Sequence, residues 1–185
     1  MRKWKRHRER IIMIKAIFFD ADGTLAIPRF LTDEKKILPG FTLDKWKEYT
    51  LIREHPYECC QRSDQLFALM KVAKQKSIKI GVLSLAYNDN ERTSKTRFIN
   101  EKYSDGSGLY VDQDMIHYYD QDPEKIAHMK RYADVNGLEY DQIMYIDDAH
   151  PTVALACSEG IEGHHISEFL REDFCTELVY RIATQ

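Results

Sequence analysis

Short apolar runs alternate with amphipathic segments along most of this chain. The apolar runs that have the length of buried strands cover residues 14–19, 78–83, 115–119 and 143–146, and residues 164–166 are a candidate for a last strand. Segments with helical spacing or helix-start signals cover residues 64–76, 91–103, 122–136, 151–158 and 167–183. Strands that alternate with helices predict an α/β fold: a Rossmann-like parallel sheet flanked by helices, with right-handed crossovers.

The helix expected at 122–136 has the clearest boundaries. Asp122 suits the N-cap position and Pro123 the first turn. Gly137 suits the position just after the last helical residue, where a left-handed backbone is common. The Gly- and Ser-rich stretch 104–108 predicts a loop.

Residues 25–62 lack a clean hydrophobic period and contain several prolines. We predict a flap or small insertion here, next to the end of the first strand. Side chains that could cover a site from this segment are Trp46, Tyr49, Arg53 and Tyr57. The rest of the chain reads as one domain over residues 13–185, preceded by a basic, flexible extension over residues 1–12.

The charge of the chain is unevenly distributed. The formal net charge is −3, but residues 1–10 carry six Lys or Arg and one Glu, which leaves −8 on the remainder. An acidic body argues against nucleic acid held across a broad basic surface. Residues 1–10 alone could contact a phosphate backbone or another anionic surface.

Neither a secretion signal nor a membrane span is expected. Lys15 and Asp20 interrupt the first apolar run, no small-residue cleavage site follows it, and no run reaches the length of a span. The cysteines, which show neither a disulfide framework nor paired zinc-site spacing, are Cys59, Cys60, Cys157 and Cys175. We therefore predict a reducing, cytoplasmic location.

The motif Asp20-Ala21-Asp22-Gly23-Thr24 follows the first apolar strand. Open α/β sheets bind ligands beyond the carboxyl ends of their strands, so two carboxylates at this position suggest a site. Gly23 permits a tight turn. Asp20 and Asp22 can point the same way, and their charges then need a cation or a shared proton.

Other polar residues stand at comparable places along the chain. Ser84 ends the second strand, Lys125 lies in the first turns of a helix, and Asp147-Asp148 end the strand at 143–146. Alone, such residues are usually a turn serine, a solvated lysine and helix-capping acids. Their conjunction, in this order, indicates a common site at one edge of the sheet.

This arrangement resembles the haloacid dehalogenase (HAD) superfamily of phosphatases and phosphotransferases. The D-x-D-G-T motif corresponds to Asp20–Thr24, the strand-ending Ser or Thr to Ser84, and the acidic pair to Asp147-Asp148. Lys125 and His128 resemble the K-x-x-H segment of the magnesium-dependent phosphatase-1 branch, which has a minimal cap. The resemblance covers residues 14–166.

The resemblance implies a role for each motif residue. Asp20 would be the nucleophile that forms an aspartyl-phosphate, and Asp22 the general acid and base. Asp20, the backbone carbonyl of Asp22, Asp147 and Asp148 would hold Mg²⁺, for which oxygen ligands are suited. Ser84 and Lys125 would bind the phosphate.

Some assignments within this set stay open. Lys102 and Lys95 are the alternatives if Lys125 points away, and the N–H groups of Leu85 and Ala86 would assist Ser84. How Asp147 and Asp148 divide metal ligation is also open. In the family, phosphatases and phosphomutases have an acid at the position of Asp22, whereas dehalogenases and phosphonatases lack one.

The leading prediction is a Mg²⁺-dependent phosphatase that hydrolyses a phosphate monoester through an aspartyl-phosphate. The substrate could be a small molecule, a phosphorylated protein or a nucleic-acid end. A phosphotransferase or phosphomutase would use the same intermediate, but such enzymes usually carry a larger cap that bars water. A receiver-type phospho-acceptor module needs a lysine after its last strand, and no lysine follows Lys130.

Overall fold

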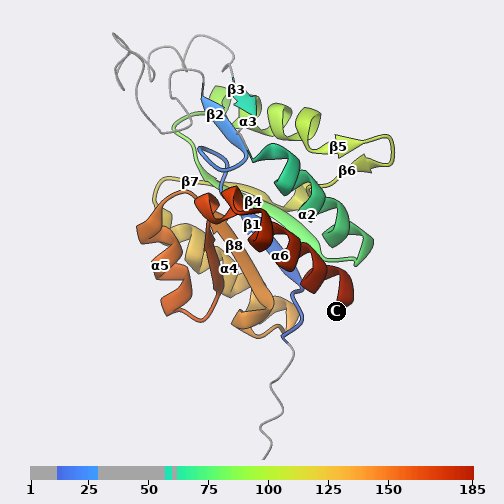
Figure 1. The fold of residues 1–185 in the computed structure, drawn as a ribbon. Helices are drawn as coiled ribbons and strands as arrows, with labels where there is room; N and C mark the ends of the chain where they lie inside the picture. Colours follow the sequence, from blue (N-terminus) through green and yellow to red (C-terminus); the bar gives the residue numbers. More distant parts are fainter. Residues whose placement is uncertain (1–11, 29–56, 60–61) are drawn as a thin grey trace, which may run out of the picture.

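A five-stranded parallel sheet forms the centre of the protein in the computed structural model, which describes residues 12–28, 57–59 and 62–185. Its strand order is β7-β4-β1-β8-β9 (Figure 1). The strands are β1 (Ala16–Phe19), β4 (Lys79–Leu85), β7 (Ile116–Tyr119), β8 (Ile143–Asp147) and β9 (Glu162–His165). All neighbouring pairs in this sheet are parallel, which confirms the predicted Rossmann-like architecture.

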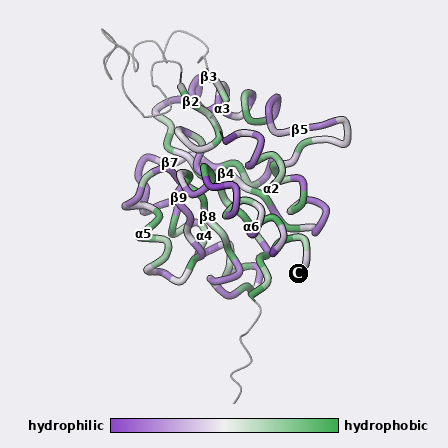
Figure 2. Tube along the Cα trace, viewed as in Figure 1, coloured by the Kyte–Doolittle hydropathy of each residue, from purple (hydrophilic) through white to green (hydrophobic). Residues whose placement is uncertain are grey.

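Helices cover both faces of the sheet. One face packs against α2 (Ser63–Gln75) and α6 (Glu172–Thr184), and the other against α4 (Asp122–Asn136) and α5 (His150–Ser158) (Figure 1). The central strand β1 serves both layers because successive side chains of a strand point to opposite faces. The hydropathy colouring shows the result, an apolar interior between two layers with hydrophilic outer faces (Figure 2).

The alternation within β1 separates two hydrophobic clusters. Ile17 and Phe19 belong to the cluster that includes Leu66 of α2. Phe18 belongs to the cluster that includes Met129 of α4. Ile17, Phe18 and Phe19 have no exposed surface, so β1 is fixed from both sides and its last residue delivers Asp20 to a defined place.

The helix α3 (Asp89–Lys102) lies beyond the carboxyl edge of the sheet, next to a small antiparallel ribbon of β2 (Ala26–Pro28) and β3 (Tyr57–Cys59) (Figure 1). Ala26, Tyr57 and Phe98 form a separate buried cluster between the ribbon and the helix. Most of the predicted insertion, residues 29–56, and most of the predicted extension, residues 1–11, lie outside the described residues.

The prediction of a loop at 104–108 is wrong. The segment forms a tight antiparallel hairpin of β5 (Ser104–Asp105) and β6 (Gly108–Leu109). The Asp105 carboxylate accepts a hydrogen bond from the backbone N–H of Ser107 at 2.7 Å. Such a side-chain bond supports a turn without a hydrophobic pattern. Two short strands of this kind leave no periodic signal in the sequence.

Two helix boundaries also differ from the prediction. Gln121, not Asp122, is the N-cap of α4, because the Asp122 carboxylate instead contacts Lys125 Nζ at 2.9 Å. The helix ends as expected at Gly137, whose φ of 64° is left-handed. The C-terminal helix is divided: a 3₁₀ turn, η3 (Ile166–Leu170), precedes α6, and Arg171 between them has an extended backbone.

Shorter 3₁₀ turns precede two strands of the sheet. They are η1 (Gln113–Met115), before β7, and η2 (Tyr140–Gln142), before β8. Among the described residues, no helix has the length and apolar character needed to cross a membrane. Cys59, Cys157 and Cys175 are free thiols.

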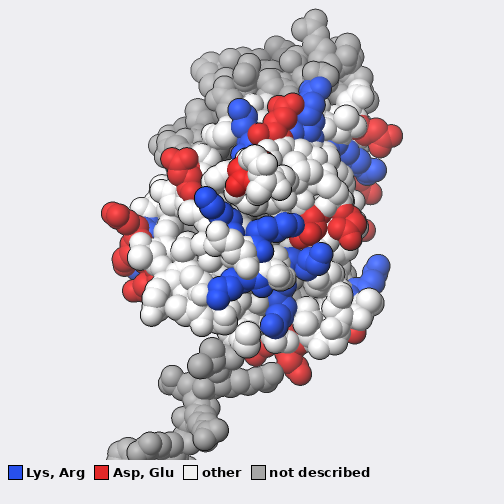
Figure 3. Space-filling model, turned by 90° about the vertical axis from the view of Figure 1, so that its right-hand side faces the viewer, with Lys and Arg blue, Asp and Glu red and all other residues white. Residues whose placement is uncertain are grey.

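One side of the molecule carries both Lys and Arg and Asp and Glu, and the basic side chains gather near its middle (Figure 3). It is the side on which α2 lies in Figure 1. Asp112 contacts two of the basic side chains, Lys74 at 3.2 Å and Lys79 at 3.4 Å. Contacts of this type are largely screened by solvent.

Candidate active site

The carboxyl ends of β4, β1 and β8 lie side by side because β1 is the strand between the other two. Asp20 directly follows β1, Ser84 lies near the end of β4, and Asp147 ends β8. The backbone N–H of Asp20 donates to the carbonyl of Ile146 at 2.9 Å, which joins the two strand ends. The exposed fractions are 5% for Asp20, 0% for Ser84 and 1% for Asp147.

A cluster of carboxylates occupies this edge. Asp20, Asp147 and Asp148 each place one carboxylate oxygen within 4.8 Å of the others. Asp147 is held in place by the backbone N–H of Ala149, which donates at 2.7 Å, and by the Tyr145 hydroxyl, which also donates to it. The structure thus brings together acids from two distant parts of the sequence.

Asp22 lies in the turn that follows Asp20. Gly23 has a φ of 79°, a conformation that side chains with a β-carbon rarely adopt, and this confirms the turn that the glycine predicted. The side chain of Asp22 is one-third exposed (34%), in contrast to that of Asp20. Asp22 is therefore the more accessible of the two carboxylates.

Lys125 reaches the carboxylate cluster from α4. Its Nζ lies 2.8 Å from Asp20, 2.9 Å from Asp122 and 3.4 Å from Asp147. Burial opposes the positive charge, but Asp20 and Asp147 outweigh it and raise the pKa of Lys125 above its ordinary value. A buried lysine beside three carboxylates is charged at neutral pH and partly neutralises this cluster.

Lys95 reaches the same edge from α3. Its Nζ lies 2.5 Å from Asp22 and 2.9 Å from Glu91, and Ser84 Oγ is 3.3 Å away. Lys95 has no exposed surface, whereas Lys102, at the end of the same helix, is exposed. From the sequence, Lys95 is an alternative to Lys125 as the phosphate-binding lysine. The structure places both lysines at the site.

The protonation of Asp20 reflects this environment. Burial raises the pKa of Asp20 to about 7 in the metal-free protein, against the attraction of Lys125, and the neighbouring Asp147 and Asp22 raise it further. Several acids around one point favour a cation between them. Asp20, Asp147 and Asp148 offer only oxygen atoms, which suits a hard divalent cation such as Mg²⁺.

The raised pKa of Asp20 predicts a pH-dependent cost in stability. Because the pKa of Asp20 in the folded protein lies above its ordinary value, protonated Asp20 favours the folded state. This contribution to stability is complete at low pH and is lost as the pH rises through about 7. In metal-free protein, Asp20→Asn should therefore gain stability relative to wild type between about pH 4.5 and about pH 8, by roughly 2–4 kcal/mol. Urea denaturation of wild type and variant at the two pH values measures their free energies of unfolding. A difference between the two proteins that is the same at both pH values would contradict the prediction.

Two residues, Ala86 and His128, lie differently from what the sequence suggested. The prediction that the N–H of Ala86 binds phosphate is wrong, because this N–H donates to the carbonyl of Tyr119 at 3.2 Å and extends the sheet. His128 does not bond to the carboxylates: its Nδ1 lies 2.6 Å from the hydroxyl of Tyr119, and its ring packs against Phe18. Burial lowers the pKa of His128 to about 4, so the ring is neutral.

Sequence reasoning missed several side chains that contact candidate site residues: Glu91, Asp122, Tyr145 and His165. Glu91 precedes Lys95 by four residues and Asp122 precedes Lys125 by three, which are the spacings of neighbours on a helix. Tyr145 lies two residues before Asp147 and so shares its face of the strand. No comparable signal marks His165, which donates from Nε2 to the carbonyl of Asp148 at 2.9 Å.

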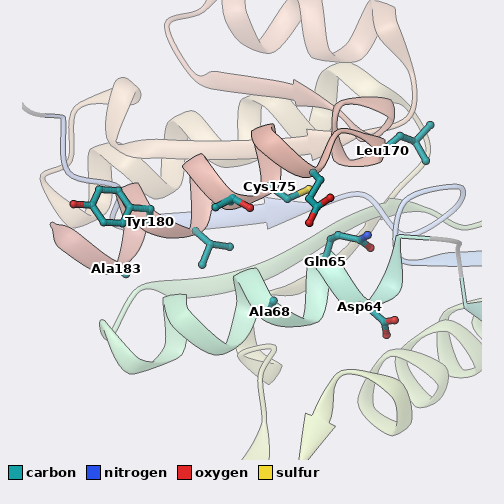
Figure 4. Close-up of a pocket in the computed structure, with 10 residues that line it drawn as sticks. Asp64, Gln65, Ala68, Leu170, Cys175, Tyr180 and Ala183 are labelled. Carbon is teal, nitrogen blue, oxygen red and sulfur yellow. The ribbon is translucent and has the colours of Figure 1, made fainter.

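A hollow lies between α2 and α6 (Figure 4). It has a volume of about 850 Å³. Residues that line it include Asp64, Gln65, Ala68, Leu170, Cys175, Tyr180 and Ala183. None of the residues that line it is a candidate site residue.

Comparisons with known proteins find similarity in structure only. No family model matches the sequence, and no curated protein matches it. A candidate HAD-like phosphatase from Mesorhizobium loti is similar over 93% of this chain and 87% of its own, with 12% identity and a TM-score of 0.52. The chain has a HAD-like fold. At this identity, the similarity concerns the fold alone.

Two further solved structures are similar with lower TM-scores. The cobalt-bound deoxy-D-mannose-octulosonate 8-phosphate phosphatase from Haemophilus influenzae has 15% identity and a TM-score of 0.49, over 94% of this chain and 91% of its own. The 3-deoxy-D-manno-octulosonate 8-phosphate phosphatase from Moraxella catarrhalis, in complex with magnesium and phosphate ions and KDO, has 15% identity and a TM-score of 0.45. The match covers 78% of this chain and 63% of the Moraxella enzyme.

Proposed function

We propose that this protein is a Mg²⁺-dependent phosphatase that hydrolyses a phosphate monoester through an aspartyl-phosphate. The observation that carries the proposal is the position of Asp20: buried, 2.8 Å from Lys125 Nζ, and in a cluster with Asp147 and Asp148. The Asp20 carboxylate therefore has the Lys125 ammonium beside it, and together with Asp147 and Asp148 it can hold a metal ion. The HAD-like fold agrees with this function.

The side chains supply the groups that two successive displacements at phosphorus need. Asp20 attacks phosphorus and forms a P–O bond as the bond to the leaving oxygen breaks, and Asp22 gives that oxygen a proton. In the second step Asp22 takes a proton from water as the water oxygen attacks phosphorus. The bond to Asp20 then breaks, and inorganic phosphate is released.

Mg²⁺ would be held by the carboxylates of Asp20, Asp147 and Asp148 and by the backbone carbonyl of Asp22. When bound, it would shield the attacking carboxylate from the phosphate charge. Ser84 would donate a hydrogen bond to a phosphate oxygen, and Lys125 would exchange part of its contact with acids for contact with the phosphate.

Finer features of the proposal rest on the sequence. The resemblance to the magnesium-dependent phosphatase-1 branch is supported by Lys125, which lies in the first turns of α4 and contacts Asp20. A cytoplasmic location agrees with the free thiols of Cys59, Cys157 and Cys175. The single-domain organisation over residues 13–185, with an insertion at 25–62, is also part of the proposal.

The direct test is hydrolysis of p-nitrophenyl phosphate by purified protein with Mg²⁺, after chelation with EDTA, and after Mg²⁺ is restored. We expect chelation to lower turnover about a hundredfold or more, because a metal ion stabilises the charge of the transition state by several kcal/mol. Restored Mg²⁺ should return the activity. Turnover that survives complete chelation would contradict the proposed use of the metal.

The same assay distinguishes the phosphotransferase. With an alcohol acceptor present, a phosphatase should release inorganic phosphate in equal amount to p-nitrophenol, whereas a transferase should release less phosphate than p-nitrophenol. A panel of sugar phosphates, nucleotides and phosphorylated peptides then ranks the substrate classes by kcat/KM.

A further inference from the structure

Lys95 is a second buried cation at the site, and its ammonium group is fully used by the protein. An ammonium has three N–H donors. Those of Lys95 can be satisfied by the carboxylate of Asp22 at 2.5 Å, the carboxylate of Glu91 at 2.9 Å and the backbone carbonyl of Leu85. The side chain is also fully buried, so bulk solvent does not reach these contacts.

The contact with Lys95 makes the two oxygens of Asp22 different. Oδ2 accepts a hydrogen bond from Lys95 Nζ. Oδ1 is buried and has no hydrogen-bond partner among the residues that the structure describes. The lysine therefore anchors one oxygen of this carboxylate, and no donor among the described residues competes for the other.

Lys95 also connects Asp22 to the strand that carries Ser84. Its Nζ lies 3.3 Å from Ser84 Oγ. Glu91 extends the connection, because its second oxygen accepts a hydrogen bond from the backbone N–H of Tyr87 at 2.8 Å. One ammonium thus joins the turn after β1 to the end of β4 and to the start of α3.

We propose that Lys95 is a positioning residue, which holds Asp22 in the orientation that delivers its proton to the leaving oxygen and fixes Asp22 relative to Ser84. This inference rests on the proposed phosphatase function. It assigns Lys95 a task different from that of Lys125, whose partners are Asp20 and Asp147. Misplacement of a catalytic group by about 1 Å can lower a rate about a hundredfold.

The leaving group provides the test. Nitrophenolate is stable without a proton, whereas an alkoxide is not, so a misplaced general acid slows hydrolysis of an alkyl phosphate far more than that of p-nitrophenyl phosphate. For Lys95→Met we expect kcat to fall about tenfold more with glycerol 3-phosphate than with p-nitrophenyl phosphate. KM should change little for either substrate. A lysine with a merely structural role would lower both values of kcat by the same factor.

Further variants separate this effect from a loss of folding. Lys102→Met, on the same helix but exposed, is the matched control and should keep the wild-type ratio of the two rates. Lys95→Met combined with Glu91→Gln removes a buried cation and a buried anion together, so it should fold even if the single variant does not. It should show the same dependence on the leaving group.

The outcomes distinguish the two proposals. If wild type hydrolyses neither phosphate with Mg²⁺ present, the phosphatase proposal fails. If wild type hydrolyses both and the folded Lys95 variants lose the two activities by equal factors, only the role of Lys95 is overturned. In combination with Asp22→Asn, loss of Lys95 should add little further dependence on the leaving group, since both changes then affect one step.

Discussion

Asp20→Asn should abolish turnover of every phosphate monoester that the wild type hydrolyses, by roughly 10⁴-fold or more. An amide oxygen is a poor nucleophile, so the aspartyl-phosphate cannot form. The side chain keeps its size and can still accept a hydrogen bond from Lys125. Single-turnover assays with a large excess of enzyme measure the residual rate.

The thermal stability of Asp20→Asn serves as the control for this result. The variant should be at least as stable as wild type at neutral pH, because the buried charge of Asp20 is removed. A folded Asn variant with substantial activity would exclude Asp20 as the nucleophile. Acid-quenched protein from a reaction with ³²P-labelled substrate should carry label in wild type and none in the variant.

Asp22→Asn should lower turnover by about 10²–10⁴-fold, the usual contribution of general acid–base catalysis. The loss should be greatest for leaving groups of high pKa, because these depend most on the proton that Asp22 supplies. Steady-state kcat values for a series of phosphate esters with different leaving groups would measure it.

Folding of Asp22→Asn should persist, because its side chain is partly exposed and Lys95 retains its contact with Glu91. Circular dichroism and thermal denaturation provide the check. If the variant unfolds under assay conditions, the primary role of Asp22 is structural. A uniform loss of rate across all leaving groups would likewise contradict its role as the acid.

The sequence predicted the sheet well because its signal is local. The strand ending at Phe19 is apolar on both faces, and both faces are indeed covered by helices. Once a strand of this kind is placed in a parallel sheet, the residue after it lies at the carboxyl edge. Asp20, Ser84 and Asp147 could therefore be placed together before any coordinates.

The lysines could not be assigned in this way. Lys95, Lys102 and Lys125 all lie in helices, and which helical side chain reaches the strand ends depends on how each helix is rotated and shifted on the sheet. Packing sets these values, and the packing depends on residues far away in sequence. The N-cap of α4 differed for a local reason, since the Asp122 carboxylate contacts Lys125, three residues later in the same helix, instead of capping its end.

The acids at the strand ends outnumber the lysines that contact them. Among the residues that the structure describes, the carboxylates involved are Asp20, Asp22, Glu91, Asp122, Asp147 and Asp148, and the lysines in contact with members of this group are Lys95 and Lys125. A dianionic ester that approaches this surface alone meets net repulsion. Binding should thus be ordered, with the divalent ion arriving before or together with the ester. An ester without the ion should bind the site weakly.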